Sequence, residues 1–71
     1  MSMDLQWVEG FTISTSIDGK AAVIRANREG LLSLANHLAS LAKEVPGSHI
    51  HFDEYNSLEE GSADLIVERI R

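Results

Sequence analysis

Residues 18–47 read DGKAAVIRANREGLLSLANHLASLAKEVPG. In order, this stretch contains signals for a turn, a strand, a helix and the end of that helix. Asp18-Gly19 is a two-residue hairpin signal, and the apolar, partly β-branched residues 21–26 predict an antiparallel return strand. Asn27 then offers a side-chain oxygen to the free amides of a first helical turn. The stretch therefore predicts a strand that leads directly into a helix.

The helix is predicted over residues 28–44. Its apolar residues recur at spacings of three and four, polar residues occupy the opposite side, and Pro46-Gly47 ends it. The apolar positions are Leu31, Leu34, Ala35, Leu38, Leu41 and Ala42, and the polar ones are Ser33, Asn36, Ser40 and Lys43. We expect the apolar side to face a sheet.

Alternating polar and apolar residues predict further strands on both sides of this unit, over residues 7–16, 49–53 and 63–70. The order ββαββ predicts an α+β domain of two layers, with a mainly antiparallel four-stranded sheet and one helix on one face. A single domain spans residues 1–71. Because one helix covers one face of a sheet, the other face is left to solvent, to a second copy of the chain or to a binding partner. A homodimer through this open face or through a sheet edge is one of these alternatives.

The predicted core joins the helix to the sheet. Its residues are Phe11, Ile13, Ile24, Leu31, Leu34, Leu38, Leu41, Ile50, Phe52 and Leu65.

The composition narrows the class of partner. The chain has 71 residues, no cysteine, and six Lys and Arg against eleven Asp and Glu, for a net charge of -5. This sign disfavours direct binding to nucleic acid or to a membrane surface, and it suits a partner with a basic surface. No apolar run approaches a membrane span and the first ten residues do not resemble a signal peptide, so we expect a cytoplasmic protein.

His49, His51 and Asp53 alternate along one predicted strand and so share one face. Two imidazoles and a carboxylate at this spacing are able to reach one metal ion, but a catalytic zinc site needs three protein ligands and an open position. The remaining histidine, His37, lies on the helix and is predicted to be a boundary or surface residue. The main interpretation is therefore an open polar strand face, with no metal and no cofactor.

The segment from Asp53 to Asp64 contains five acids and no base. Such a run is usually a solvated loop, but Tyr55 and Leu58 interrupt it, and an aromatic anchor among carboxylates is suited to a basic partner. Two alternatives stay open, since Tyr55 is also able to cap the sheet edge and Leu58 to lie under the loop. The candidate partner-binding residues are His49, His51, Asp53, Glu54, Tyr55, Leu58, Glu59 and Glu60.

Three linked segments carry a family resemblance: ANREGLLSLANHLASLA at 26–42, SHIHFDEYNSLEEGS at 48–62 and ADLIVERI at 63–70. Together they resemble the immunity protein 32 family of bacterial toxin-immunity systems. The matching positions are His49, His51, Asp53, Leu58, Glu59, Glu60, Gly61 and Ser62. The resemblance implies a small α+β protein that binds and neutralises a cognate toxin, often a nuclease, and is not an enzyme.

Two classes of function follow. In the first, the acidic segment and the strand face bind a basic toxin. In the second, His49, His51 and Asp53 form a small metal-binding module or a metal-dependent enzyme.

Overall fold

The computed structural model describes residues 6–71, so the first five residues lie outside the described part. The chain forms β1 (Ile13–Asp18), β2 (Ala21–Ala26), α1 (Arg28–Leu41), β3 (His49–Phe52) and β4 (Leu65–Glu68). The predicted order ββαββ and the α+β class are confirmed. Within residues 6–71, no helix has the length and apolar character that crossing a membrane requires.

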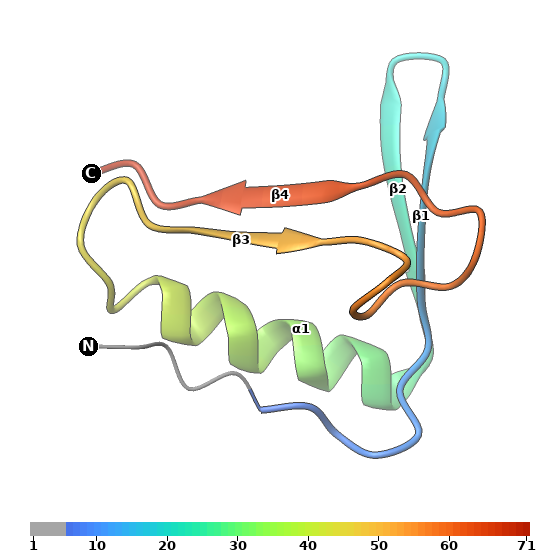
Figure 1. Cartoon of the computed structure of the whole chain (residues 1–71), viewed down its shortest axis with the longest axis horizontal. Coiled ribbons are helices and arrows are strands. Elements are labelled where there is room, and N and C mark those ends of the chain that lie inside the picture. The colour runs from blue at the N-terminus through green and yellow to red at the C-terminus, as the bar shows by residue number, and fades with distance from the viewer. Residues whose placement is uncertain (1–5) are drawn as a thin grey trace.

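The four strands form two separate antiparallel pairs, β1 with β2 and β3 with β4, and not the single sheet expected. The β1–β2 hairpin stands across the end of the molecule, while β3 and β4 run alongside α1 (Figure 1). The loop between β3 and β4 occupies the outer edge of β1, where Glu59 N–H donates to the carbonyl of Ile13 (2.8 Å) and Ala63 N–H donates to that of Thr15 (3.1 Å). The two pairs therefore meet through this loop.

The β1–β2 hairpin turns at Gly19-Lys20, one residue later than the sequence signal suggested. The last register pair is Asp18 with Ala21, which leaves two residues in the turn. Gly19 has φ of +61° and the non-glycine residues of the described chain have no positive φ. This is the pattern of a type II′ turn, which needs glycine at its first central position.

Residues 6–12 form an irregular segment along α1, which we call the strap, and the prediction of a strand from Trp7 was wrong here. Phe11 N–H donates to the carbonyl of Val8 (3.2 Å), and Gly10 has φ of +86°. The tight turn made by these residues interrupts the strand pattern, so β1 begins only at Ile13.

The strap is attached to the helix by polar side chains of α1. Ser33 Oγ accepts a hydrogen bond from Val8 N–H (2.8 Å) and donates to the carbonyl of Glu29 (2.8 Å). The Asn36 amide donates to the carbonyl of Gln6 (3.3 Å). The side of α1 that the sequence pattern assigned to solvent is thus partly covered, and Ser33 is fully buried.

Asn27 joins the strap to the start of α1. Its Oδ1 caps the helix by accepting from Gly30 N–H (2.7 Å) and also accepts from Thr12 N–H (3.0 Å), while its amide donates to the carbonyl of Gly10 (2.9 Å). Gly30 permits the backbone of Thr12 to approach the first turn of α1 closely, since a Cβ at position 30 would lie 2.4 Å from the carbonyl oxygen of Thr12.

α1 ends at Leu41, three residues before the predicted end. After it, Lys43 N–H donates to the carbonyl of Ser40 (3.1 Å) and Glu44 N–H to that of Leu41 (3.0 Å), so the chain tightens into i to i+3 turns.

The core lies between α1, the inner face of β3–β4 and the base of β1. Its buried apolar residues are Ile13, Leu34, Leu41, Ile50, Phe52 and Leu58, and Phe11, Ala26, Leu65 and Val67 pack against them. Three predicted core residues were wrong, since Ile24, Leu31 and Leu38 are 46%, 57% and 45% exposed. Leu31 and Leu38 face away from β3–β4 because the strap and the sheet already cover the other sides of the helix.

His37 is fully buried, which corrects the prediction that it is a boundary or surface residue. Its ring stacks on Phe52 with centroids 5.6 Å apart and meets Trp7 of the strap edge to face at 4.0 Å. Both ring nitrogens lack a hydrogen-bond partner among the described residues. Burial lowers the pKa of His37 because the charged imidazolium has no compensating group.

Phe52 and Ile66 provide a matched test of the packing, since they lie on opposite faces of the β3–β4 ladder. Phe52 is 1% exposed and Ile66 is 61% exposed. Phe52→Ala should lower the free energy of unfolding by about 3–5 kcal/mol because it leaves a cavity, and Ile66→Ala by less than about 1 kcal/mol. Urea denaturation measures both values, and equal losses would contradict the assignment of the two faces.

The buried His37 should make stability fall in mild acid. Below its ordinary pKa of 6.5 the unfolded chain takes up a proton that the folded protein does not, so the free energy of unfolding decreases as the pH falls from there towards the lowered pKa of the folded state. His37→Phe should flatten this part of the profile. Thermal unfolding between pH ~7.5 and ~5 measures it, with the exposed His49→Gln as control. A profile unchanged by His37→Phe would show that other groups cause the acid sensitivity.

Candidate partner-binding surface

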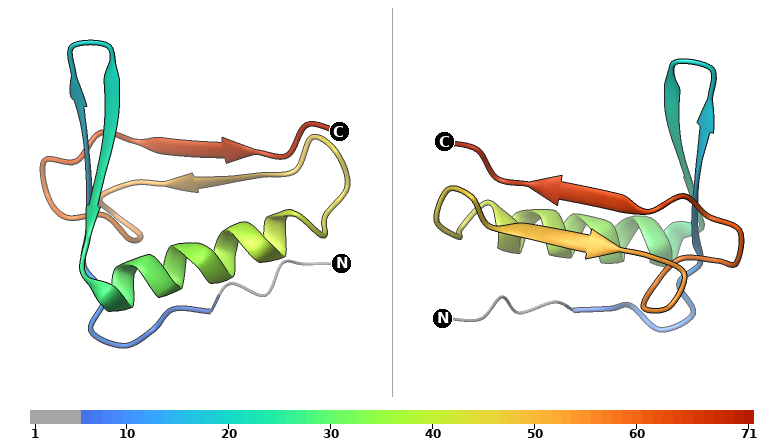
Figure 2. Two further views of the ribbon diagram at one scale, coloured as in Figure 1. Left: turned by 180° about the vertical axis from the view of Figure 1, so that it is seen from behind. Right: turned by 45° about the horizontal axis from the view of Figure 1, so that its top comes forward.

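Residues 53–64, which we call the acidic loop, connect β3 to β4 and wrap round the base of β1 (Figures 1 and 2). Their backbone is held by hydrogen bonds from within the loop and from β1. This surface contains most of the candidate residues named from the sequence.

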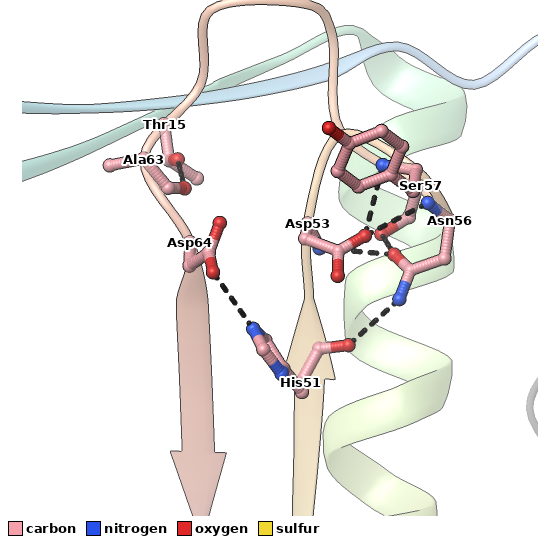
Figure 3. A network of polar contacts seen from close by, with 8 residues as sticks. Thr15, His51, Asp53, Asn56, Ser57, Ala63 and Asp64 are labelled. Carbon is pink, nitrogen blue, oxygen red and sulfur yellow. Dashed lines mark hydrogen bonds and ion pairs between the residues drawn. The ribbon is translucent and has the colours of Figure 1, made fainter.

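Asp53 and Asn56 build the first turn of the acidic loop (Figure 3). Asp53 Oδ1 accepts from the backbone N–H of Tyr55 (2.9 Å) and of Asn56 (3.0 Å). The Asn56 side chain accepts from Asp53 N–H (3.1 Å) and donates to the carbonyl of His51 (3.0 Å). Asp53 therefore has a structural role in the loop, and the signal was present in the sequence as an Asp followed closely by an Asn in a turn.

The second half of the acidic loop is fixed to the body of the protein. Leu58 is 4% exposed and belongs to the core, as the alternative interpretation of this residue allowed. Glu54 Oε2 accepts from Gly61 N–H (3.0 Å) across the loop. Thr15 N–H donates to Ser62 Oγ (3.2 Å), and Thr15 Oγ1 donates to the carbonyl of Ala63 (Figure 3). The part played by Thr15 and Ser62 was not foreseen, because nothing in the spacing of these residues indicated that they meet.

The side chains that remain at the surface of the loop are an aromatic ring and carboxylates. Tyr55 is 91% exposed, and only its backbone N–H takes part in the turn. The exposed acids of the loop are Glu54, Glu59, Glu60 and Asp64. A ring with this exposure among acids provides an apolar contact inside a region of negative charge.

Glu59 also borders a shallow depression of about 350 Å³ at the base of the β1–β2 hairpin. The depression is lined by Thr12, Ile13, Ser14, Arg25, Ala26, Asn27 and Glu59. Arg25 provides positive charge on its wall, so the negative region does not extend past Glu59 onto β2.

The open face of β3–β4 adjoins the acidic loop. The register places His51 opposite Ile66 and His49 opposite Glu68, and all four residues are exposed. His51 Nε2 lies 3.1 Å from Asp64 Oδ2 (Figure 3), and both side chains are about half exposed. An exposed pair of this kind contributes little to stability.

The three residues of the metal hypothesis do not converge. His51 contacts Asp64, whereas one carboxylate oxygen of Asp53 is engaged by the backbone of the next turn. Within residues 6–71, no group of three or more His, Cys, Asp or Glu is placed to hold a metal ion.

Residues 22–70 match the family model described as immunity protein 32, a match that covers well over half of the chain. The chain belongs to the immunity protein 32 family. The matched region begins within β2 and includes α1, β3, the acidic loop and β4, while the strap and β1 fall outside it. No curated protein and no solved structure matches the chain.

Proposed function

We propose that this member of the immunity protein 32 family neutralises a cognate bacterial toxin by binding to it, without performing chemistry of its own. The observation that carries the proposal is the family match over residues 22–70, which includes the whole acidic loop. A cytoplasmic, bacterial setting belongs to the same proposal.

The acidic loop is the surface that we assign to the toxin. Its exposed carboxylates accelerate the approach of a basic protein, and the Tyr55 ring provides apolar area that loses its water on contact. The chain as a whole carries a net charge of -5, which acts in the same direction. A basic surface on the toxin, such as one that binds phosphate groups, is the complement of this loop.

Preorganisation supports the same assignment. The loop backbone is tied by Asp53, Asn56 and Glu54 from within and by β1 from outside. A loop that is already ordered loses little conformational entropy on binding, so the contact energy of its side chains is retained as affinity.

The candidate residues divide between direct and indirect roles in this proposal. Glu59, Glu60 and Tyr55 are available for direct contact, with His49 and His51 on the neighbouring strand face. Leu58 supports the loop from the core. Asp53 accepts two backbone hydrogen bonds and Glu54 accepts one, and these bonds shape the loop.

The adjacent gene's product is the first protein to test as the toxin, with association rates measured at two ionic strengths. Replacing Glu59 and Glu60 with Gln should lower the association rate roughly 3- to 10-fold at low salt and flatten its salt dependence. The control is Glu9→Gln with Glu44→Gln, which removes the same amount of charge in the strap and in the turns that follow α1. Equal effects from both pairs would show that net charge, and not the acidic loop, guides association.

Tyr55 should govern release. Tyr55→Ala should raise the dissociation rate by about 30-fold, equivalent to a hot-spot loss of about 2 kcal/mol, while Tyr55→Phe should stay close to the parent because it keeps the ring. The fold should be intact in both variants, since the side chain is 91% exposed. Unchanged dissociation from Tyr55→Ala, with binding intact, would place the interface elsewhere.

A further inference from the structure

The outward side of α1 is apolar. Leu31, Leu32 and Leu38 are 57%, 41% and 45% exposed, and Ala35 and Ala39 on the same side of the helix are also exposed. Seen from behind, no other segment of residues 6–71 passes in front of this helix (Figure 2, left). We call these five residues, with Ala42 at one end, the outer face of α1.

This arrangement is the reverse of an ordinary surface helix, whose polar side faces water. Here Ser33 is buried and hydrogen-bonded to the strap, and Asn36 also binds it. Leu31 and Leu38, which the sequence pattern assigned to the core, are left outside, whereas Leu34 and Leu41 are buried as predicted. Contiguous exposed apolar area on a small protein indicates an interaction site.

The outer face has a two-fold pattern centred on Ala35. Leu31 and Leu32 lie four and three positions before it, and Leu38 and Ala39 lie three and four positions after it. In two antiparallel helices related by a two-fold axis, residues at equal distances before and after the centre lie at the same level. Two copies therefore bring Leu38 of one chain level with Leu32 of the other, and Ala39 level with Leu31, so that a leucine pair and a leucine-alanine pair lie on each side of the axis.

We propose that a second copy of this chain covers the outer face, through antiparallel packing of α1 against α1 with Ala35 at the two-fold axis. Alanine at the crossing lets the helix axes approach to the short end of the usual range of about 8–10 Å. In this packing Ala42 of one copy lies level with Arg28 of the other. The aliphatic stem of Arg28 then covers the small alanine side chain.

Charge favours a second copy over a basic toxin at this surface. The exposed charged residues that border the outer face are Arg28, which lies 3.8 Å from the carboxylate of the neighbouring Glu29, and Lys43, and no acid lies among the apolar residues of the outer face. A basic protein would therefore meet no negative charge among the residues of the outer face. Two copies that each carry a net charge of -5 meet through a surface that holds none of their acids. The proposal is independent of toxin binding, because the acidic loop is a different surface.

The first test is the mass of the full chain in solution, measured by sedimentation over a range of concentrations up to millimolar. The parent should reach twice the mass of one chain, and Ala35→Glu should remain at the mass of one chain, because it places two like charges across the axis. Circular dichroism verifies that the helix is intact. A parent that stays monomeric throughout would overturn the proposal.

The matched control is Ala22→Glu, which adds the same charge to β2 of the exposed hairpin, away from α1. It should dimerise like the parent. The reverse result, with dimers lost in Ala22→Glu and kept in Ala35→Glu, would overturn the proposal and place the second copy on the sheet edge, which the sequence also left open.

Because the chain contains no cysteine, single cysteines can be introduced to test whether the two helices are antiparallel. Ala35→Cys should oxidise to a disulfide-linked dimer, because the two new thiols face each other at the axis. Ala42→Cys should not, since in an antiparallel pair its two copies are about 21 Å apart along the helix at 1.5 Å per residue. Efficient crosslinking of both variants would indicate parallel helices and contradict the proposed geometry, and crosslinking of neither would contradict the interface.

Discussion

The attachment of the acidic loop to the outer edge of β1 is the constraint on which the architecture depends. Ile13 and Thr15 accept backbone hydrogen bonds from Glu59 and Ala63 along the outer edge of β1, which is one of the two outer edges of the hairpin. Because the loop occupies this edge, neither β3 nor β4 pairs with β1, and the strands form two separate pairs. The attachment also buries Ile13 completely and holds Leu58 in the core, so the loop is part of the fold and not an appendage.

The same attachment explains why an acidic loop can be rigid in a chain of this size. A run of carboxylates normally repels itself and stays solvated. In this loop two acids are used internally, Asp53 on the backbone of its own turn and Glu54 on Gly61. The other exposed carboxylates are attached to a backbone that these hydrogen bonds hold in place. Charges at fixed positions select a partner by the arrangement of its charges as well as by their sign.

The limits of sequence reasoning here follow from which contacts are local. The existence of the hairpin, the Asn27 cap and the alternation of β3 each depend on neighbours in the sequence and were predicted correctly, although the hairpin turn lies one residue later than its sequence signal. The strap, the burial of His37 and the exposure of Leu31 and Leu38 depend on what covers each side of α1. Helical periodicity identifies an apolar stripe, but it does not indicate that residues 6–12 will cover the polar one.

On the candidate surface, too, features that depend on local sequence were predicted and features that depend on distant contacts were not. The acids and Tyr55 were identified from composition, since exposure is the usual state of such residues, but the roles of Thr15 and Ser62 required knowledge of a contact across 47 positions. Leu58 was ambiguous because a leucine in a polar loop is equally suited to a partner and to the core.

The strap determines how the apolar residues of α1 are shared between folding and association. Its hydrogen bonds to Ser33 and Asn36 turn the polar side of the helix inward and bring Trp7 onto His37. The cost is a buried imidazole whose nitrogens have no hydrogen-bond partner among the described residues, and this is offset by the ring contacts around it. With one side of α1 against the strap and one against β3, the remaining side faces outward with its leucines. Leu34 and Leu41 already fill the side toward the sheet, so the strap completes the core on a second side of α1 and leaves the outer face open to association.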